Sequence, residues 1–418
     1  MSRMVNYVIV VTAIFCVLFI SLPVHAASLT KVPRSDWAGS VSLPNYAEMN
    51  IYVPDKLATH PPIVVSNHAC GSSVSGQLDN NKKIRTAADK NGFIMIFPHN
   101  PGQNCWDVGS NKSMSHDGGG DTHAIAQMVR YALEKYDGDS SRVYVLGGSS
   151  GGMMTQALLG IYPEIFTAGA PRAGVPCGCW AESYSASNQW SGPCAGGSVS
   201  KTAQQWGDYV RAINPDYTGH RPRVQIFQGE NDATISFKNM GEAIKQWTNV
   251  LELNTEPDST DKITTAYTYN RRFWKNDCGY IVLEAWSAPG QGHSMSYEED
   301  AIIAFFGLDI VDGRDPGLAA CDVHGTDSKK STKQAQKFFL FREKTLVLNT
   351  AKANEVSVKV MNTSGRILYN GNYKTCSNKL PISIPLSFLQ PGCYISSAIF
   401  YEKDKQIDSH NFHFILTK

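Results

Sequence analysis

The chain has 418 residues, of which 42% are hydrophobic and 10% aromatic, and its 38 basic residues are nearly balanced by 37 acidic ones. This balance excludes a partner selected by strong net charge, such as nucleic acid or an anionic membrane surface. The hydrophobic share excludes a wholly disordered chain, because that much apolar surface can close a sizeable core.

The first 26 residues have the pattern of a secretory signal peptide. Arg3 precedes an apolar run over residues 8–22, and the sequence Val24-His25-Ala26 then suits signal peptidase. The run is shorter than a membrane-spanning helix requires, and Pro23 interrupts its end. We therefore expect cleavage after residue 26 and a secreted, extracellular protein that no longer contacts a membrane.

Cysteine usage agrees with export. Ten cysteines less Cys16 in the signal segment leave nine, which are Cys70, Cys105, Cys177, Cys179, Cys194, Cys278, Cys321, Cys376 and Cys393. In an oxidising compartment most of these pair as disulfides, and the odd number leaves at least one free or intermolecular thiol. The one-residue spacing of Cys177 and Cys179 is poor for structural zinc, so we expect no metal site.

Between about residues 46 and 306, short apolar runs alternate with amphipathic stretches, which is typical of an α/β fold. Strands are predicted at residues 62–66, 93–97, 143–146 and 224–227. Their near-continuous apolar character indicates a mostly parallel sheet that is buried on both faces. Apolar residues at helical spacing over residues 125–136 predict a crossover helix.

After residue 306 the composition and the hydrophobic pattern of the sequence change. Residues 309–333 are rich in Gly, Asp, Ser and Lys and are predicted to be a linker. Further short strands are predicted at residues 338–341, 345–348, 356–361, 367–369, 382–384 and 393–400. The predicted organisation is a signal peptide (1–26), an α/β domain (27–308), a linker (309–333) and a small all-β sandwich (334–418).

The turn after the predicted strand at residues 143–146 carries a G-x-S-x-G motif, in Gly148-Ser149-Ser150-Gly151-Gly152. A sharp strand-to-helix turn of this kind presents a serine hydroxyl to a substrate carbonyl, and the helix N-terminus favours the negative charge that develops. We assign Ser150 as the nucleophile, because Gly148 and Gly152 lie two residues to either side. Ser149 is the alternative within the same turn.

Such turns are typical of the α/β-hydrolase fold, in which an acid and then a histidine follow the serine along the chain. Asp232, in the turn after a predicted strand, is the expected acid, and Glu230 and Asp208 are the alternatives. His293 is the expected base, in a glycine-containing loop after another predicted strand. It would take the proton of Ser150 and return it to the leaving alcohol, while Asp232 orients the imidazole.

An oxyanion hole is expected from backbone N–H groups on two loops. One donor follows the nucleophile, at Gly151, and the other lies in the loop after the first predicted strand, at Cys70 with help from Gly71. His68 in the same loop is expected to be a packed core residue rather than a catalytic one.

Several motifs together resemble the secreted acetylxylan esterases of carbohydrate esterase family one, a family that also includes feruloyl esterases and is related to polyhydroxybutyrate depolymerases. The motifs are His68-Ala69-Cys70-Gly71, Asn104-Cys105-Trp106-Asp107-Val108, His116-Asp117-Gly118-Gly119-Gly120-Asp121, Ser149-Ser150-Gly151-Gly152-Met153-Met154 and Gln205-Trp206-Gly207-Asp208. The likeness spans about residues 46–308, and residues 177–194 depart from the family pattern.

This resemblance implies an α/β-hydrolase fold without a cofactor, acting on acetylated xylan of the plant cell wall. It supports Ser150, Asp232 and His293 as the triad, and it implies a disulfide between Cys70 and Cys105. The alternatives are a feruloyl esterase, a polyester depolymerase and a non-catalytic wall-binding protein. We expect a monomer.

Tryptophan is the expected sugar-binding side chain, because an indole face packs on the apolar face of a pyranose. The candidates are Trp106, Trp180 and Trp206, with Trp190 as a further one. The C-terminal residues 358–367 and 386–395 resemble the sorting domains of type IX secretion but lack their Asn-Pro pair. An accessory sandwich and a carbohydrate-binding module are the alternatives for this segment.

Overall fold

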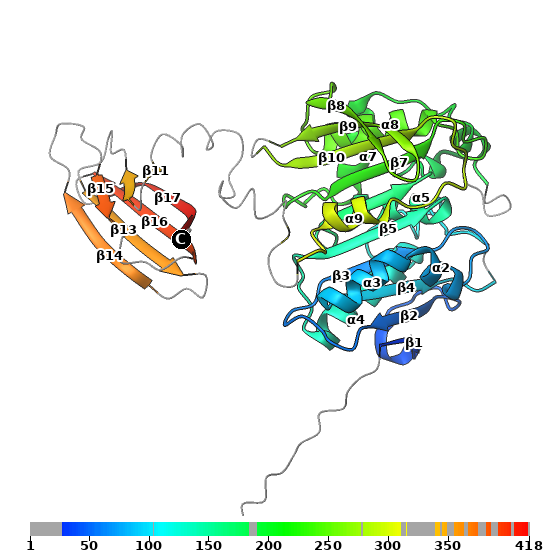
Figure 1. The fold of residues 1–418 in the computed structure, drawn as a ribbon, viewed down its shortest axis with the longest axis horizontal. Helices are drawn as coiled ribbons and strands as arrows, with labels where there is room; N and C mark the ends of the chain where they lie inside the picture. Colours follow the sequence, from blue (N-terminus) through cyan, green and yellow to red (C-terminus); the bar gives the residue numbers. More distant parts are fainter. Residues whose placement is uncertain are drawn as a thin grey trace, which may run out of the picture.

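A computed structural model describes residues 27–102, 104–183, 190–276, 279–310 and 315, together with seven strands between residues 339 and 416 (Figure 1). The expected signal peptide and most of the expected linker lie outside the described residues. Within the described part of the chain, no helix is both long and apolar enough to cross a membrane.

The main structure is a ten-stranded sheet in the order β1-β2-β4-β3-β5-β6-β7-β10-β9-β8. Its strands are β1 (Ser28–Val32), β2 (Glu48–Val53), β3 (Ile63–Asn67), β4 (Ile94–His99), β5 (Val143–Gly148), β6 (Ala168–Arg172), β7 (Arg223–Gly229), β8 (Ser259–Thr264), β9 (Thr268–Lys275) and β10 (Ile281–Ala288). The central strands, from β4 through β10 in this order, pair in parallel. The outer strands pair antiparallel, so the sheet is mixed but mostly parallel.

Helices cover both faces of this sheet. They are α1 (Arg34–Trp37), α2 (Val74–Asn80), α3 (Lys82–Asn91), α4 (Asp121–Tyr136), α5 (Ser150–Ile161), α6 (Gly192–Ala195), α7 (Ala203–Ile213), α8 (Lys238–Val250) and α9 (Glu299–Phe306), with the 3₁₀ turn η1 (Trp180–Ser183). Side chains of α2, α3 and α9 pack on one face, and those of α1, α4, α5, α7 and α8 pack on the other.

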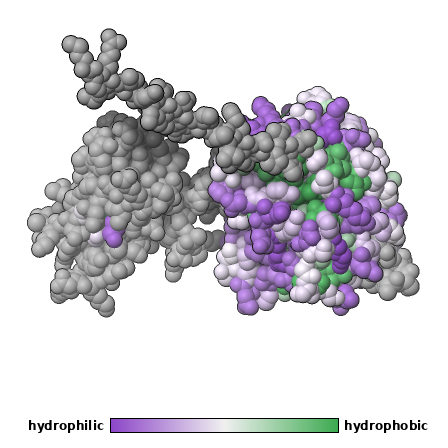
Figure 2. Space-filling view, turned by 90° about the horizontal axis from the view of Figure 1, so that it is seen from below, coloured by the Kyte–Doolittle hydropathy of each residue, from purple (hydrophilic) through white to green (hydrophobic). Residues whose placement is uncertain are grey.

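Alternation along the strands explains why the sheet has two cores. On β3, Ile63 and Val65 join the cluster under α4 and α5, while Val64 between them joins the cluster under α3 and α9. Successive side chains of a strand point to opposite faces, so an all-apolar strand needs cover on both sides. Figure 2 shows hydrophilic side chains over much of the described surface, with a hydrophobic strip between them.

The C-terminal strands form two antiparallel sheets, β11-β12-β15 and β14-β13-β16-β17. Their bounds are β11 (Phe339–Arg342), β12 (Thr345–Leu348), β13 (Glu355–Asn362), β14 (Ile367–Lys374), β15 (Ile382–Pro385), β16 (Gly392–Glu402) and β17 (Lys405–Leu416). The six strands expected in this region are all present, and β17 was not expected. Val358 and Val360 on β13 are fully buried, as the alternating pattern requires.

The packed α/β part of the molecule continues past its expected end at residue 308. Asp315 is fully buried, forms an ion pair with the equally buried Arg223, and accepts a hydrogen bond of 2.9 Å from the Tyr144 hydroxyl. The segment expected to begin a linker therefore contributes a charged group to the interior of the domain.

Candidate active site

The sheet topology brings five loops together. Strands β3, β4, β5, β7 and β10 run in parallel, so the loops that follow them meet at the carboxyl edge of the sheet. These loops carry Cys70, Trp106, Ser149, Asp232 and His293, in the order of their strands. The side chains that are far apart in the sequence are therefore gathered by the fold itself.

Ser149 occupies the turn between β5 and α5 in a strained conformation. Its φ is 56° and its ψ is −123°, a backbone region that residues other than glycine rarely adopt. Its N–H donates to the carbonyl of Arg172 at 2.9 Å. A Cβ on Gly147 would lie 2.3 Å from the carbonyl oxygen of Gly151, so the turn closes only with glycine at position 147.

His293 links this serine to a buried carboxylate. Its Nε2 lies 2.8 Å from Ser149 Oγ, and its Nδ1 lies 2.8 Å from Asp232 Oδ2. The Asp232 side chain is fully buried, and its other oxygen accepts the N–H groups of Thr234 and Ile235, each at 2.9 Å. A carboxylate fixed in this way holds the Nδ1–H tautomer and leaves Nε2 able to accept the serine proton.

The loops that carry Asp232 and His293 are joined along their backbones. Asn231 N–H donates to the Gln291 carbonyl at 2.9 Å, and a Cβ on Gly229 would lie 2.4 Å from the same oxygen. The approach therefore needs glycine at position 229. The expected alternatives for the acid are engaged elsewhere, as Glu230 accepts a hydrogen bond from Ser287 and Asp208 pairs with Arg211.

Ser150 does not contact the imidazole, so its predicted pairing with His293 is wrong. It is the first residue of α5, is 2% exposed, and its Oγ accepts a hydrogen bond of 2.8 Å from the Trp106 N–H. The motif fits two registers, because Gly147 and Gly151 flank Ser149 as Gly148 and Gly152 flank Ser150. The distinguishing signal is the end of β5 at Gly148, which leaves Ser149 alone in the turn.

A disulfide between Cys70 and Cys105 joins the loops after β3 and β4, which confirms the expected pairing. The prediction that Gly71 contributes to the oxyanion hole is wrong, because its N–H already donates to the Asn104 carbonyl at 2.7 Å. Gly151 serves packing, since a Cβ there would lie 2.2 Å from the Asn67 carbonyl oxygen. The oxyanion donor was expected on the residue after the nucleophile. With Ser149 in the turn, that residue is Ser150 and not Gly151. Ser150 lies in the first turn of α5, where backbone N–H groups lack intrahelical partners.

A pocket with a volume of about 800 Å³ opens over this group. Its walls include Ser149, His293, Cys70, Arg172 and Trp190. The three tryptophans predicted to bind sugar are buried, at 5% exposure for Trp106 and Trp180 and 0% for Trp206.

Trp206 is wrong as a sugar-binding residue, because its whole side chain lies in the core and its Nε1 donates to Glu242 at 2.8 Å. Trp106 instead donates from its indole Nε1 to the His68 carbonyl at 2.9 Å. Trp190, at 45% exposure, is the tryptophan that reaches solvent.

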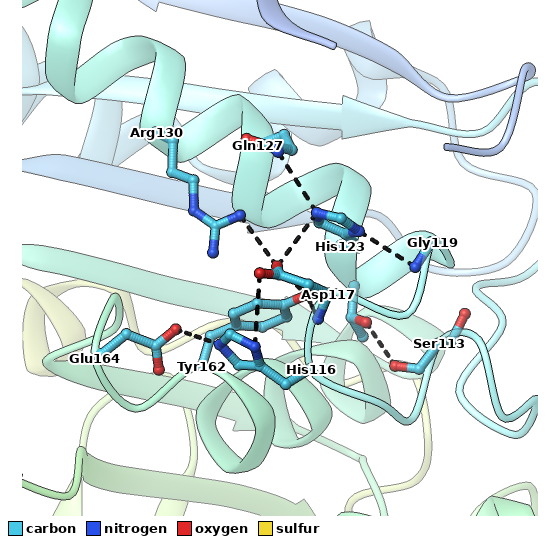
Figure 3. Close-up of polar contacts among 10 residues, drawn as sticks. Ser113, His116, Asp117, Gly119, His123, Gln127, Arg130, Tyr162 and Glu164 are labelled. Atoms are coloured by element: carbon cyan, nitrogen blue, oxygen red, sulfur yellow. Dashed lines mark hydrogen bonds and ion pairs between the residues drawn. The ribbon is translucent and has the colours of Figure 1, made fainter. Parts of the chain in front are cut away.

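The His116–Asp121 motif forms a polar cluster away from the serine turn, at the opposite end of α5 (Figure 3). Asp117, with a φ of 52°, accepts a hydrogen bond from Arg130 at 3.1 Å and lies 3.2 Å from His123 Nε2. Burial would raise the pKa of Asp117, but Arg130 and the nearby histidines lower it overall. The cluster joins α4 to the C-terminal end of α5, the helix that begins directly after Ser149.

Groups of three or more histidine, cysteine or acidic side chains placed to hold a metal ion are not found among the described residues. Of the cysteines that the structure describes, Cys179 pairs with Cys194 and Cys177 is a free, buried thiol. Burial raises the pKa of Cys177 to about 12, which makes it an unreactive core residue.

A mixed, mostly parallel sheet with a strained serine after a central strand and a histidine after the last parallel strand defines an α/β hydrolase. Comparisons with known proteins give the family. Feruloyl esterase B of Thermothelomyces thermophilus is 40% identical over 295 residues, which cover 69% of this chain and 98% of that protein. Acetylxylan esterase A of Aspergillus oryzae is 36% identical over 290 residues, which cover 69% and 91%.

A solved structure agrees with these relatives. The acetyl xylan esterase from Aspergillus awamori is 36% identical, with a TM-score of 0.60 and coverage of 68% of this chain and all of that one. The prolyl oligopeptidase family also matches, over residues 80–260. The chain belongs to the family of acetylxylan esterase A and feruloyl esterase B, carbohydrate esterase family one, and is a serine esterase.

Proposed function

We propose that this protein removes acetyl groups from xylan by a Ser149–His293–Asp232 triad. The observation that carries the proposal is the continuous chain of hydrogen bonds from Ser149 Oγ through the imidazole to Asp232, with 2.8 Å at each step. A serine hydroxyl is a weak nucleophile until a neighbouring base can take its proton. His293 is that base, and Asp232 stabilises the imidazolium that forms.

The reaction proceeds in two halves. Ser149 Oγ attacks the acetyl carbonyl as His293 Nε2 takes its proton, and the carbonyl oxygen becomes an oxyanion. The N–H groups of Ser150 and Cys70 stabilise this oxyanion. The bond between the acetyl carbon and the sugar oxygen then breaks as His293 donates its proton to that oxygen, which leaves as a hydroxyl of the sugar. Water, activated by the same imidazole, attacks the acetyl-serine and releases acetate.

Two features support Ser150 and Cys70 as the oxyanion donors. Ser150 is the first residue of α5, so its N–H lies at the positive end of the helix dipole. Cys70 lines the pocket beside Ser149 and is tied to Cys105 by the disulfide. The backbone N–H of Trp106, the residue after Cys105, donates to Ser150 Oγ. This hydrogen bond fixes the loop after β4 against the start of α5.

Acetylated xylan is favoured as the substrate because proteins named acetylxylan esterase recur among the relatives, with coverage of 91% and 100% of their own lengths. A feruloyl ester of arabinoxylan is the second candidate, because the relative named feruloyl esterase B is 40% identical. Both are plant cell-wall esters. The pattern of the first 26 residues and the two disulfides support action outside the cell.

The test is an assay of the purified protein with 4-nitrophenyl acetate, acetylated xylan and methyl ferulate, beside the variant Ser149→Ala. We expect acetate release from xylan that exceeds ferulate release, and loss of both in the variant. Faster turnover of methyl ferulate would assign the feruloyl alternative. Equal rates for the variant and the parent protein would refute the serine mechanism.

A further inference from the structure

Arg172 brings a positive charge to the wall of the catalytic pocket. It is the last residue of β6, and its backbone carbonyl accepts the Ser149 N–H at 2.9 Å. Its half-buried side chain lines the same pocket as Ser149 and His293. A Cβ on Gly148 would overlap with Arg172 Nη2, so glycine at position 148 leaves the space that the guanidinium occupies. The guanidinium therefore lies against the residue that precedes the nucleophile.

Two contacts hold this guanidinium in one orientation. Its Nη1 donates to the His293 carbonyl at 3.2 Å. The guanidinium carbon lies 4.6 Å from the centre of the Tyr297 ring, which is a cation–π contact. A planar guanidinium whose orientation is already fixed loses less entropy when a ligand binds to it. Arg172 is therefore prepared to bind a ligand in the pocket.

The charge of Arg172 has no carboxylate partner among the described residues. The ion pairs between arginine and carboxylate in that part of the chain involve Arg130, Arg211, Arg223 and Arg271. Of the two acidic residues on the pocket wall, Glu299 accepts two backbone N–H groups of α3, and Asp79 is exposed to solvent. Arg172 Nε is buried without a hydrogen-bond partner in the described part of the chain. A guanidinium has five N–H donors, and the one that serves His293 leaves others for an anion.

A carboxylate is the anion that best fits this site, because guanidinium and carboxylate pair through two parallel hydrogen bonds. The pocket has a volume of about 800 Å³, which leaves room beyond an acetyl group for a neighbouring sugar. The carboxylate has two possible sources, an acidic sugar of the substrate chain and the acetate released at Ser149. A cation that retained acetate would slow turnover, which favours the acidic sugar.

We propose that Arg172 binds the carboxylate of an acidic sugar beside the acetylated one, so that the protein prefers acetyl esters on xylan that carries uronic acid. The inference rests on the proposed function and adds a specificity-determining residue to it. Because Arg172 pairs with the chain and not with the reacting ester, the pairing lowers KM for acidic xylan and has little effect on kcat.

The experiment uses two xylans acetylated to the same degree, one with glucuronic acid side groups and one neutral. For the parent protein, kcat/KM on the acidic polymer should exceed that on the neutral polymer by about tenfold. Arg172→Met also loses the hydrogen bond to the His293 carbonyl, so the ratio of the two values is the decisive readout. This ratio should fall to about one, through KM on the acidic polymer, and Arg172→Lys should restore part of it. Arg85→Met, at an arginine of α3 outside the pocket wall, is the matched control and should keep the ratio.

A binding measurement separates recognition from turnover. In the Ser149→Ala background, a xylo-oligosaccharide with a glucuronic acid side group should bind about tenfold more tightly than its neutral counterpart. Adding Arg172→Met should abolish this difference. Raising the salt concentration should reduce it, because salt screens the attraction between the guanidinium and the carboxylate.

Three results would overturn the carboxylate site. The first is equal kcat/KM of the parent protein on the two polymers. The second is a ratio that survives Arg172→Met, which would show that Arg172 only holds the His293 loop. The third is inhibition by acetate that Arg172→Met relieves while the two polymers react equally, which would assign the carboxylate to the product.

A failure of the proposed function has a different signature. Release of acetate from neither polymer by the parent protein would refute xylan as the substrate. Activity of Ser149→Ala on 4-nitrophenyl acetate would refute the serine mechanism. Neither result depends on Arg172, so the two failures are distinguishable.

Discussion

Ser149 and His293 are 144 positions apart in the sequence, yet their Oγ and Nε2 atoms lie 2.8 Å apart. The neighbouring Ser150 faces the other way and accepts the N–H of Trp106. The two adjacent serines therefore have different contacts. Ser149 lines the pocket and contacts the imidazole, whereas Ser150 is buried and contacts the backbone of Trp106. The consequences for each can be measured separately.

Replacing Ser149 with alanine should reduce kcat on 4-nitrophenyl acetate by at least about four powers of ten, because the attacking hydroxyl is removed. Ser150→Ala should lose no more than about tenfold, since only the hydrogen bond from the backbone N–H of Trp106 disappears. Steady-state kinetics of both variants, with circular dichroism as the check on folding, make the comparison. The reverse order of effects would restore Ser150 as the nucleophile.

Asp232→Asn should lower kcat by about three to four powers of ten with little change in KM. The amide cannot stabilise an imidazolium, and its NH₂ group favours the wrong tautomer of His293. Glu230→Gln is the matched control, because Glu230 contacts Ser287 rather than the imidazole and should cost less than about tenfold. If the two variants lose activity equally, the assignment of the acid fails.

The sequence predicts the central sheet well because buried parallel strands leave a strong signal. The predicted strands at residues 62–66 and 143–146 are found as β3 and β5, whose side chains are all buried. The short β6, with sequence AGAPR, was not predicted, because alanine, glycine and proline give no apolar run. The edge strand β8, with sequence STDKIT, is polar and mostly exposed, so it lacks the same signal.

The site was less predictable than the fold. Asp232 and His293 follow from chain order, but the serine register depends on where β5 ends, which glycine at both 147 and 148 obscures. Residue type alone also does not separate a binding tryptophan from a core one. Trp206 lies four positions before Val210 on α7, so the two side chains share one face of the helix, and both are buried.

Asp121 makes stability depend on pH in an unusual direction. Burial raises its pKa to about 6, so the folded protein favours the protonated form. This stabilising contribution is complete below the unfolded pKa of 3.8 and is lost as the pH rises through about 6. The shift of about two pH units corresponds to about 3 kcal/mol.

Asp121→Asn removes this titration. The free energy of unfolding of the variant, minus that of the parent protein, should therefore increase by up to about 3 kcal/mol between pH 4 and pH 7. Urea denaturation at a series of pH values measures the difference. A difference that stays constant across this range would show that the pKa of Asp121 is the same in the folded and unfolded protein, against the expected shift.

The Cys70–Cys105 disulfide links stability to catalysis. Cys70→Ala with Cys105→Ala opens a loop with a sequence separation of 35, which should cost about 3 to 4 kcal/mol of unfolding free energy. It also frees the loop that presents the Cys70 N–H, so kcat on 4-nitrophenyl acetate should fall by about tenfold to a hundredfold. Removal of the Cys179–Cys194 disulfide is the control. It should destabilise the fold without lowering kcat on 4-nitrophenyl acetate, because neither cysteine lines the catalytic pocket.

The buried pair of Arg223 and Asp315 tests where the α/β domain ends. Asp315→Ala leaves the guanidinium of Arg223 in the interior without its carboxylate, which should cost about 3 to 5 kcal/mol in the full chain. Asp309→Ala, at an exposed position of the same segment, should change the unfolding free energy by no more than about 0.5 kcal/mol. Replacing Arg223 with methionine in the Asp315→Ala background should recover part of the loss, because no buried charge then remains. Equal, small effects of Asp315→Ala and Asp309→Ala would mean that the domain is complete without the segment after residue 308.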